Sequence, residues 1–586
     1  MMPSLNPELR SLRKILNSNW HIIPDYQRSY AWTENNLMDF WEDITNRPSG
    51  HFLGSVVVTG SEDDDKEIVD GQQRLTTTLI ALSAIRDQFS ALGAEDLANG
   101  IHETFIYAKD ESTKSKPRLK NESTEANNRI EDAVFSLPQD RRETEKLNKR
   151  ESLESLAYQF FQGRIIEYLS NKSQKMEALI ELKELLLKAR VIYVVSEDRN
   201  GAFRIFETLN DRGTVLEPLD LIKNFLFQYV SDDPARQAVK TWNETASILE
   251  QLSLPSVSTK RFAYYAWNSR TGSESQSAKY VLNERLLRSV MDYVINKDEA
   301  VSRERALEIV KYFNFCARLL SSFEDVLKER AGKVTWKKFD PNFRKNKYDE
   351  INRHLYGILV TEASQPIPLL LSLFYVYFKD GGALTAKMLR NFLEAIHKFQ
   401  FRWTIAQKNS TENQRKPYRL AATRVFEATS AENIDAALQD FTKTTSGTLR
   451  PTDIQFKDGL KKLKISSENR KDYFKILFIL SELARRSGNP IGSEATPTIE
   501  HLKGQANVPS RSPRYYWIFK MGNLIILPSE VNEALKGDFA EKAESIHKYV
   551  HGWDKELLSA IDEKDWSSSR AKTRLEQIAS IAAEIW

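Results

Sequence analysis

The sequence predicts a multidomain α+β protein that is mostly helical. Strand patterns occur mainly in residues 1–230, amphipathic helical patterns replace them in 231–440, and helices with two short apolar strands occupy 441–586. A chain of 586 residues is too long for one hydrophobic core. We therefore expect three domains with these boundaries: a mixed α/β domain, a helical domain, and a helical domain that carries the two strands.

Composition excludes several classes of protein. The chain is 41% hydrophobic and 28% charged, which is typical of a folded protein, and its net charge of +3 gives no global signal for nucleic acid. A single cysteine, Cys316, excludes an internal disulfide framework and favours the reducing cytoplasm. The most apolar segment, 367–378, is too short to span a bilayer and predicts a buried helix. We expect a cytoplasmic protein with no membrane partner.

Local patterns place individual elements. Apolar runs predict strands, and periodic apolar residues predict helices, one of them capped by Thr33. The predicted strands are 52–58, 67–70, 189–196, "PTIEH" (497–501) and "NLIILP" (523–528). The predicted helices are 33–44, a long one after Gly71, 200–210, 219–230, 305–329, 471–486 and one after Asn532. The polar segment 109–128 has no periodicity and predicts an exposed loop.

The sequence "DGQQR" (70–74) lies where a strand meets a helix. A helix N-terminus favours an anion, and the guanidinium of Arg74 suits a phosphate. Asp70 could hold magnesium or orient a water, and Gln72 and Gln73 could bond phosphate or sugar. No GxxxxGK[ST] sequence occurs, so this is not a P-loop. Alternatively, Asp70 caps the helix and Arg74 forms a surface salt bridge.

Two other polar junctions carry an arginine. Gln27 and Arg28 follow the apolar "IIP", and Asn210 and Arg212 lie at a helix-to-turn junction in "FETLNDRG". If the α/β domain brings the three junctions together, they could converge on a polyanion.

A second group of residues lies near the end of the chain. A nuclease of the HNH type needs a ββα hairpin in which a histidine deprotonates water and a metal ion neutralises the phosphate. We assign His501 as general base, Asn523 as the residue that orients it, and Glu500 and Asn532 as ligands of Mg²⁺ or Mn²⁺. Alternatively, "EH" is a surface carboxylate beside a solvated histidine.

A basic segment, 332–349, combines lysine and arginine with aromatic residues. The basic residues attract phosphates, and exposed aromatic rings can stack on a base. The residues assigned to DNA binding are Lys337, Lys338, Arg344 and Lys345. In the alternative, the segment is a solvated loop whose aromatic residues pack into the helical core.

Four blocks in order over about residues 14–228 resemble the N-terminal domain of the GmrSD family of modification-dependent (type IV) restriction enzymes. They are "IPDYQRSYAW", "FLGSVVV", "EIVDGQQRLTTTLIALSAIRD" and "FRIFETLNDRGTVLEPLDLIKNFLF". The resemblance implies a ParB/sulfiredoxin-like domain that binds and hydrolyses a nucleoside triphosphate (GTP or ATP) through DGQQR. It implies catalytic roles for Asp70 and Arg74. It also implies nucleotide contacts from Gln27, Arg28, Gly71, Gln72 and Gln73, with Asn210 and Arg212 in a further matching block.

The pattern "IEH…GNLIIL…N…F..K", which ends at Lys542, resembles the C-terminal ββα-metal HNH domain of the same family. One departure is that the proline expected soon after the histidine is displaced to Pro509. The two resemblances imply an anti-phage endonuclease that cleaves modified double-stranded DNA under nucleotide control. They are also compatible with a homodimer. The alternative is a nucleotide-switched DNA-binding protein whose HNH site is degenerate.

Overall fold

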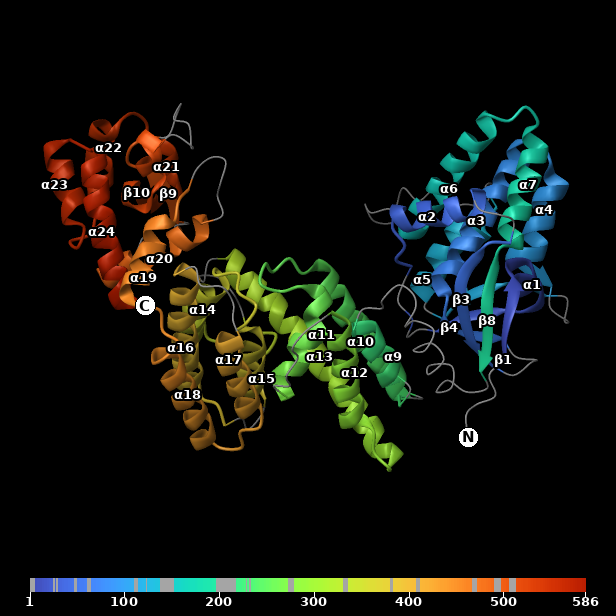
Figure 1. Ribbon diagram of the computed structural model, residues 1–586, viewed down its shortest axis with the longest axis horizontal. Helices are drawn as coiled ribbons and strands as arrows, with labels where there is room; N and C mark the ends of the chain where they lie inside the picture. The colour runs from blue at the N-terminus through green and yellow to red at the C-terminus, as the bar shows by residue number, and fades with distance from the viewer. Residues whose placement is uncertain are drawn as a thin grey trace. The chain divides into compact units, whose positions relative to one another are not determined.

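The computed structural model describes residues 6–24, 27, 30–46, 50–60, 65–109, 114–122, 124–137, 152–196, 218–227, 229–230, 233–271, 279–329, 336–379, 383–406, 412–465, 472–488, 497–504 and 513–586 (Figure 1). The chain divides into two compact units. The N-terminal unit comprises 1–239 with 294–307, and the C-terminal unit comprises 240–293 with 308–586. The predicted boundary at 230 lies near the first division, whereas the predicted boundary at 440 separates two parts of one unit.

A six-stranded mixed sheet forms the centre of the N-terminal unit, in the order β1-β8-β3-β4-β2-β7. Its strands are β1 (Asn6–Ser11), β2 (His21–Ile23), β3 (Phe52–Thr59), β4 (Lys66–Asp70), β7 (Leu119–Asn121) and β8 (Arg190–Ser196). β3 pairs antiparallel with β4 and parallel with β8. A bulge interrupts the β3–β4 register beside Val57, which is the partner of Asp70. The end of β4 is therefore locally irregular, as sheets often are beside functional sites.

Helices complete this unit. They are α1 (Leu12–Ser18), α2 (Glu34–Thr45), α3 (Gln72–Ala91), α4 (Glu95–Ile101), α5 (Thr124–Ile130), α6 (Leu153–Ser170), α7 (Lys175–Lys188) and α9 (Pro218–Phe227), with π-helical turns η1 (His102–Ile106) and η2 (Glu131–Phe135) and a small hairpin of β5 (Tyr107–Lys109) and β6 (Ser115–Pro117). α3 is buried along most of its length and packs on α6. Its position fixes the β4–α3 junction against the hydrophobic core.

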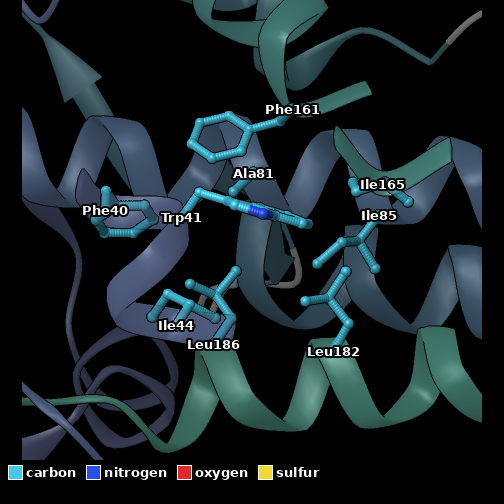
Figure 2. Close-up of a pocket in the computed structure, with 9 residues that line it drawn as sticks. All are labelled: Phe40, Trp41, Ile44, Ala81, Ile85, Phe161, Ile165, Leu182 and Leu186. Atoms are coloured by element: carbon cyan, nitrogen blue, oxygen red, sulfur yellow. The ribbon is translucent and has the colours of Figure 1, made fainter. Parts of the chain in front are cut away.

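An apolar pocket lies among α2, α3, α6 and α7 (Figure 2). Phe40, Trp41, Ile85, Phe161 and Leu186 are among the side chains that point into it. The surface that lines it is entirely apolar. A nucleotide needs charged or polar partners for its phosphates, so this pocket is a packing gap of the core and does not suit a nucleotide.

The strands predicted at 52–58, 67–70 and 189–196 are confirmed by β3, β4 and β8, and the helix at 33–44 by α2, which has Thr33 as its N-cap. The exposed loop predicted for 109–128 is wrong. Within it β6, β7 and α5 form, and Leu119 is buried in the core. The two strands are only three residues long, so they give no alternating pattern in the sequence. The helix predicted at 200–210 lies outside the described residues.

The C-terminal unit is mostly helical. The helices after α9 are α10 (Asp233–Gln251), η5 (Thr259–Arg261), α11 (Phe262–Thr271), α12 (Lys279–Val294), α13 (Glu299–Lys328), α14 (Lys345–Leu359), α15 (Ile367–Phe378), α16 (Ala386–Ile405), α17 (Glu412–Phe426), α18 (Ala431–Ser446), α19 (Asp453–Lys462) and α20 (Tyr473–Arg486). The predictions at 305–329, 367–378 and 471–486 are confirmed by α13, α15 and α20. In the part of the chain that the structure describes, no helix has the length and apolarity needed to cross a membrane.

A two-stranded antiparallel hairpin follows the helices. β9 (Pro497–His501) pairs with β10 (Leu524–Pro528), and α21 (Ser529–Ala534) follows directly. The other elements around it are η6 (Pro513–Phe519), η7 (Met521–Asn523), α22 (Phe539–His547), α23 (Lys555–Glu563) and α24 (Ser568–Ile585). Both strands were predicted, and they form a ββα arrangement (Figure 1).

α20 connects this hairpin to the larger helices of the same unit. It packs on β9 and β10, and its Glu482 accepts a hydrogen bond of 2.9 Å from Arg353 on α14. Phe478 of α20 also contacts the rings of His397 and Trp586. The hairpin therefore packs on a helix that is itself held by the rest of the unit, which suits a site that needs precise geometry.

Candidate functional site

The junction of β4 and α3 depends on Gly71. This residue is the N-cap of α3 and has φ +94°, a conformation that residues with a side chain rarely adopt. A Cβ atom here would lie 2.7 Å from Val56 Cγ2 and 3.0 Å from the Ser55 carbonyl oxygen. The turn is therefore accessible only to glycine, because any side chain would collide with β3. The N-cap is Gly71 and not Asp70, so the simple capping alternative for Asp70 does not hold.

Arg74 folds back onto β3 from the first turn of α3. Its Nη1 donates to the Ser55 carbonyl oxygen at 2.8 Å and lies 4.0 Å from Asp70 Oδ2. The Ser55 hydroxyl lies 3.4 Å from the same carboxylate oxygen. At Gly54 a Cβ would approach the guanidinium to 3.0 Å, so this glycine provides the space that Arg74 occupies. Asp70, Arg74 and Ser55 thus form one polar cluster.

The Arg74–Asp70 pair is loose and partly exposed. The side chains are 27% and 22% exposed, and 4.0 Å is the outer limit for an ion pair. Such a pair contributes little to stability. A guanidinium has five N–H donors, and among the described residues only the Ser55 carbonyl accepts from Arg74. The remaining donors can therefore bind an anion.

The structure brings the first two polar junctions together. Gln27 Nε2 donates to the Val69 carbonyl oxygen at 2.9 Å, at the end of β4. Gln73 Oε1 accepts from the backbone N–H of Ala31 at 2.9 Å, whereas Gln72 is buried. Gln27 and Gln73 thus tie the segment after β2 to the DGQQR turn. Arg28, Asn210 and Arg212 lie outside the described residues, so the third junction stays a prediction.

At the β9–β10 hairpin, His501 is the last residue of β9 and pairs with Leu524. It is 9% exposed, and its Nε2 atom is buried with no hydrogen-bond partner among the described residues. Burial lowers the pKa of His501, while the Glu500 carboxylate and the backbone of Ile465 partly oppose that shift. The imidazole is therefore neutral at pH 7, which is the form that a general base needs. The alternative of a solvated surface histidine is wrong, because the ring is buried.

Glu500 is held by a buried lysine. Lys542 on α22 is 6% exposed, and its ammonium donates to Glu500 Oε1 at 2.5 Å and to the His501 carbonyl oxygen at 3.4 Å. Asn532 on α21 donates to Thr498 Oγ1 at 2.9 Å and lies near the Ile499 carbonyl. Glu500 and Asn532 therefore both lie against β9.

Glu500 and Asn532 meet only part of what a metal ion needs. Within the described ranges, no three His, Cys, Asp or Glu side chains group closely enough to hold a metal. Glu500 and Asn532 offer two oxygen donors, which suit Mg²⁺ because that ion keeps several water ligands. Lys542 already neutralises the carboxylate. A divalent ion would have to displace Lys542 or use the other carboxylate oxygen.

Asn523 does not orient the imidazole, in contrast to the predicted role. Its Oδ1 accepts from the Lys503 backbone N–H at 2.9 Å and from the Trp566 indole at 2.8 Å. Its Nδ2 donates to the carbonyl oxygens of Lys503 at 3.0 Å and Ile518 at 2.8 Å. All the hydrogen-bonding capacity of the amide is used. Asn523 therefore fixes the loop that follows His501 and acts on the base only indirectly.

We expect Asn523→Ala to destabilise the C-terminal unit by about 3 kcal/mol, because it leaves buried partners such as the Trp566 indole unsatisfied. Chemical denaturation monitored by tryptophan fluorescence measures the change. Ser559→Ala, which alters an exposed hydroxyl of the same unit, is the control and should change stability by less than about 0.5 kcal/mol. Equal stability of the two variants would contradict the role of Asn523 in fixing the loop after His501.

In the basic segment, Lys337, Lys338 and Arg344 are exposed, and the side chain of Lys345 lies outside the described residues. The aromatic residues are not available to stack on a base. Trp336 and Tyr348 are fully buried, and Trp336 stacks on Phe374 at 5.0 Å between centroids. The second alternative, packing into the helical core, is confirmed. DNA binding by the four basic residues stays a prediction.

Several residues of these sites were not identified from the sequence. Ser55 accepts a hydrogen bond from Arg74, and Gly54 leaves the space that Arg74 occupies. Trp566 donates to Asn523. The buried Arg574 pairs with Asp554 and donates to the carbonyl oxygens of Gly522 and Leu524. A glycine inside a strand pattern, as at Gly54, is the one signal that could have indicated a close approach. The other partners are distant in sequence.

The fold and these clusters define an α+β protein with a polar strand-to-helix junction in one unit and a buried histidine on a ββα hairpin in the other. Residues 12–227 match the family model described as GmrSD restriction endonuclease, N-terminal domain. The match covers less than half of the chain, so it shows the likeness of this segment to the N-terminal domain of a GmrSD restriction endonuclease and no more. No curated protein matches the chain. The ParB/sulfiredoxin likeness and the HNH assignment stay predictions.

Proposed function

We propose that this protein is a type IV restriction endonuclease that cleaves modified foreign DNA under the control of a bound nucleoside triphosphate. The observation that carries the nuclease assignment is the Nε2 of His501 on a ββα hairpin, which is buried and has no partner in the described part of the chain. A neutral imidazole in that place accepts a proton from a water that attacks the phosphodiester. The family match over 12–227 supports restriction as the context of this chemistry.

In the nuclease site, Glu500 and Asn532 would hold Mg²⁺ or Mn²⁺, whose chemistry is to neutralise the phosphate and stabilise the leaving oxygen. His501 takes the proton of the attacking water, and Asn523 keeps the loop after His501 in place. Lys542 neutralises Glu500 while no other cation is bound. Each of these residues lies on or against the hairpin.

In the N-terminal unit, the DGQQR turn would bind the phosphates of GTP or ATP. The positive end of α3 and the unused donors of Arg74 attract the phosphates, and Asp70 orients a water or holds magnesium. Gln27, Gln72 and Gln73 shape the turn, with Arg28, Asn210 and Arg212 as further nucleotide contacts. Hydrolysis there would regulate DNA cleavage in the other unit.

Two features of the hairpin site favour a second function, in which the nuclease site is degenerate. Lys542 occupies the carboxylate that a metal would need, and the described residues include no group of three acidic, histidine or cysteine metal ligands. These are properties of a degenerate nuclease site. The protein would then be a nucleotide-switched DNA-binding protein. Pro509, whose displacement suggested this alternative, lies outside the described residues.

One paired assay on the purified full chain tests the proposal. The protein is incubated with GTP or ATP, Mg²⁺ and plasmid DNA that is unmodified, glucosyl-hydroxymethylated or phosphorothioated, and phosphate release and DNA cleavage are read together. We expect cleavage of one modified DNA only, with a rate that depends on the nucleotide. Phosphate release without cleavage of any DNA, in Mg²⁺ and in Mn²⁺, would favour the second function.

A further inference from the structure

Two lysines converge on one tyrosine in the C-terminal unit. Lys464 and Lys520 form an isolated antiparallel bridge through their backbones. Their ammonium groups lie 5.2 Å and 4.5 Å from the centroid of the Tyr516 ring. Tyr516 is 38% exposed, so the group reaches solvent. We call Lys464, Lys520 and Tyr516 the lysine seat.

The charges of the lysine seat are not balanced. Among the residues that the structure describes, no carboxylate forms an ion pair with Lys464 or Lys520. Asp472 attracts Lys520, but it accepts from the Lys464 backbone N–H at 3.3 Å and lies 3.8 Å from the ammonium of Lys475. Burial lowers the pKa of Lys520, and the charge of Lys464 adds to that shift. The Lys520 ammonium donates to the Lys461 carbonyl oxygen at 2.6 Å, a neutral partner that leaves its charge in place. Two neighbouring ammonium groups, neither in an ion pair with a described carboxylate, favour the binding of an anion.

The position of the lysine seat indicates which anion. Ile465, the residue after Lys464, donates its N–H to the Phe519 carbonyl oxygen at 2.9 Å, and the backbone of Ile465 acts on the pKa of His501. On the other strand of the bridge, Lys520 precedes Asn523, which fixes the loop after His501. Lys464 therefore adjoins a residue whose backbone acts on His501, and Lys520 lies three residues before the one that fixes the loop after His501.

We propose that Lys464 and Lys520, supported on Tyr516, bind a backbone phosphate of the DNA strand next to His501. This inference rests on the proposed nuclease function and names the residues that hold its substrate. A phosphate between the two ammonium groups offsets their mutual repulsion and brings the adjoining phosphodiester toward the imidazole. The contact reads no base, so it acts on modified and unmodified DNA alike.

Salt dependence of DNA binding tests the seat. Lys464→Gln, Lys520→Gln and the double variant are made in the full chain, and binding of a short labelled duplex is measured in EDTA over a series of salt concentrations. Because the two lysines share one phosphate, the double variant should reduce the magnitude of the slope of log K against log salt by about 0.9, and each single variant by less. Lys464→Arg with Lys520→Arg keeps both charges and should keep the wild-type slope.

Lys548 provides a matched control, because its ammonium also lies over a tyrosine ring, 5.1 Å from the centroid of Tyr549. Lys548→Gln should leave the slope unchanged. A double Gln variant with the wild-type melting temperature and the wild-type slope would overturn the inference. The inference would also be overturned if the double Gln variant lost the binding of inorganic phosphate or ATP but bound DNA as the wild type does.

The failure of the seat and the failure of the nuclease function give different results. If the wild type cleaves no DNA but the double Gln variant still loses slope, the seat stands and the nuclease function fails. If the wild type cleaves DNA and the double variant binds and cleaves as the wild type does, the function stands and the seat fails. If the lysine seat and the nuclease function are both correct, DNA cleavage by the double variant should show a raised KM with a smaller change in kcat.

Discussion

His501→Ala should lower the rate of DNA cleavage by about 10²- to 10⁴-fold, the range that a general base contributes. The imidazole is buried, and within the described ranges its Nε2 has no hydrogen-bond partner and no other histidine lies on the hairpin. Nicking of supercoiled plasmid in Mg²⁺ or Mn²⁺ measures the rate. DNA binding in EDTA should stay within a factor of about 2, because the substitution removes no fixed positive charge.

His547→Ala is the matched control, since His547 is an exposed histidine of the same unit at the end of α22. It should cleave at the wild-type rate. The pH profile adds an independent readout. The neutral imidazole is the active form, and its pKa is lowered, so cleavage should persist as the pH falls through the ordinary histidine range and be lost only below the lowered pKa. Undiminished cleavage by His501→Ala would remove His501 from the mechanism.

Asp70→Asn should reduce phosphate release from GTP or ATP by about 10²-fold, the lower end of the range for a group that positions or activates a reacting water. The substitution keeps the shape of the side chain and its contact with the Ser55 hydroxyl, but removes the negative charge that faces Arg74. Fold disruption is therefore not expected, and the melting temperature should stay within a few degrees of the wild type.

Glu67→Gln, on the same strand, is the control for Asp70→Asn and should hydrolyse nucleotide normally. The variant also tests the coupling between the two units. If hydrolysis controls cleavage, Asp70→Asn protein should cleave modified DNA with a changed rate or a changed dependence on nucleotide. Cleavage with unchanged rate and specificity, in a protein that no longer releases phosphate, would show that the units act independently.

Sequence reasoning succeeded where a structure depends on neighbours in the chain. The strand, the glycine turn and α3 follow from an apolar run, Gly71 and a periodic helix within residues 67–89, and the hairpin strands follow from two apolar runs. Sequence reasoning failed at β6 and β7, which are too short to show a period. β7 is also stabilised by the distant strand β2.

The sites show the same division. Asp70, Arg74, Glu500 and His501 could be selected from the sequence, because their residue types occur at a strand end or a strand-to-helix turn. Their partners could not be selected. Lys542 reaches Glu500 from 42 residues away, and Trp566 reaches Asn523 from 43 residues away. Such pairings depend on the packing of helices, which no local pattern encodes.

By itself, the sequence determined the types of the longer elements, the glycine turn before α3 and the choice of the histidine as a candidate, because backbone preferences and apolar periodicity are local properties. Only the tertiary structure decided which groups each side chain meets. It buried Trp336 in the core and removed it from DNA binding, used all the hydrogen bonds of Asn523 on a loop, and placed Lys542 on Glu500. Burial and long-range contacts set the charge, the pKa and the free hydrogen-bonding capacity of a side chain, and these properties decide what it can do.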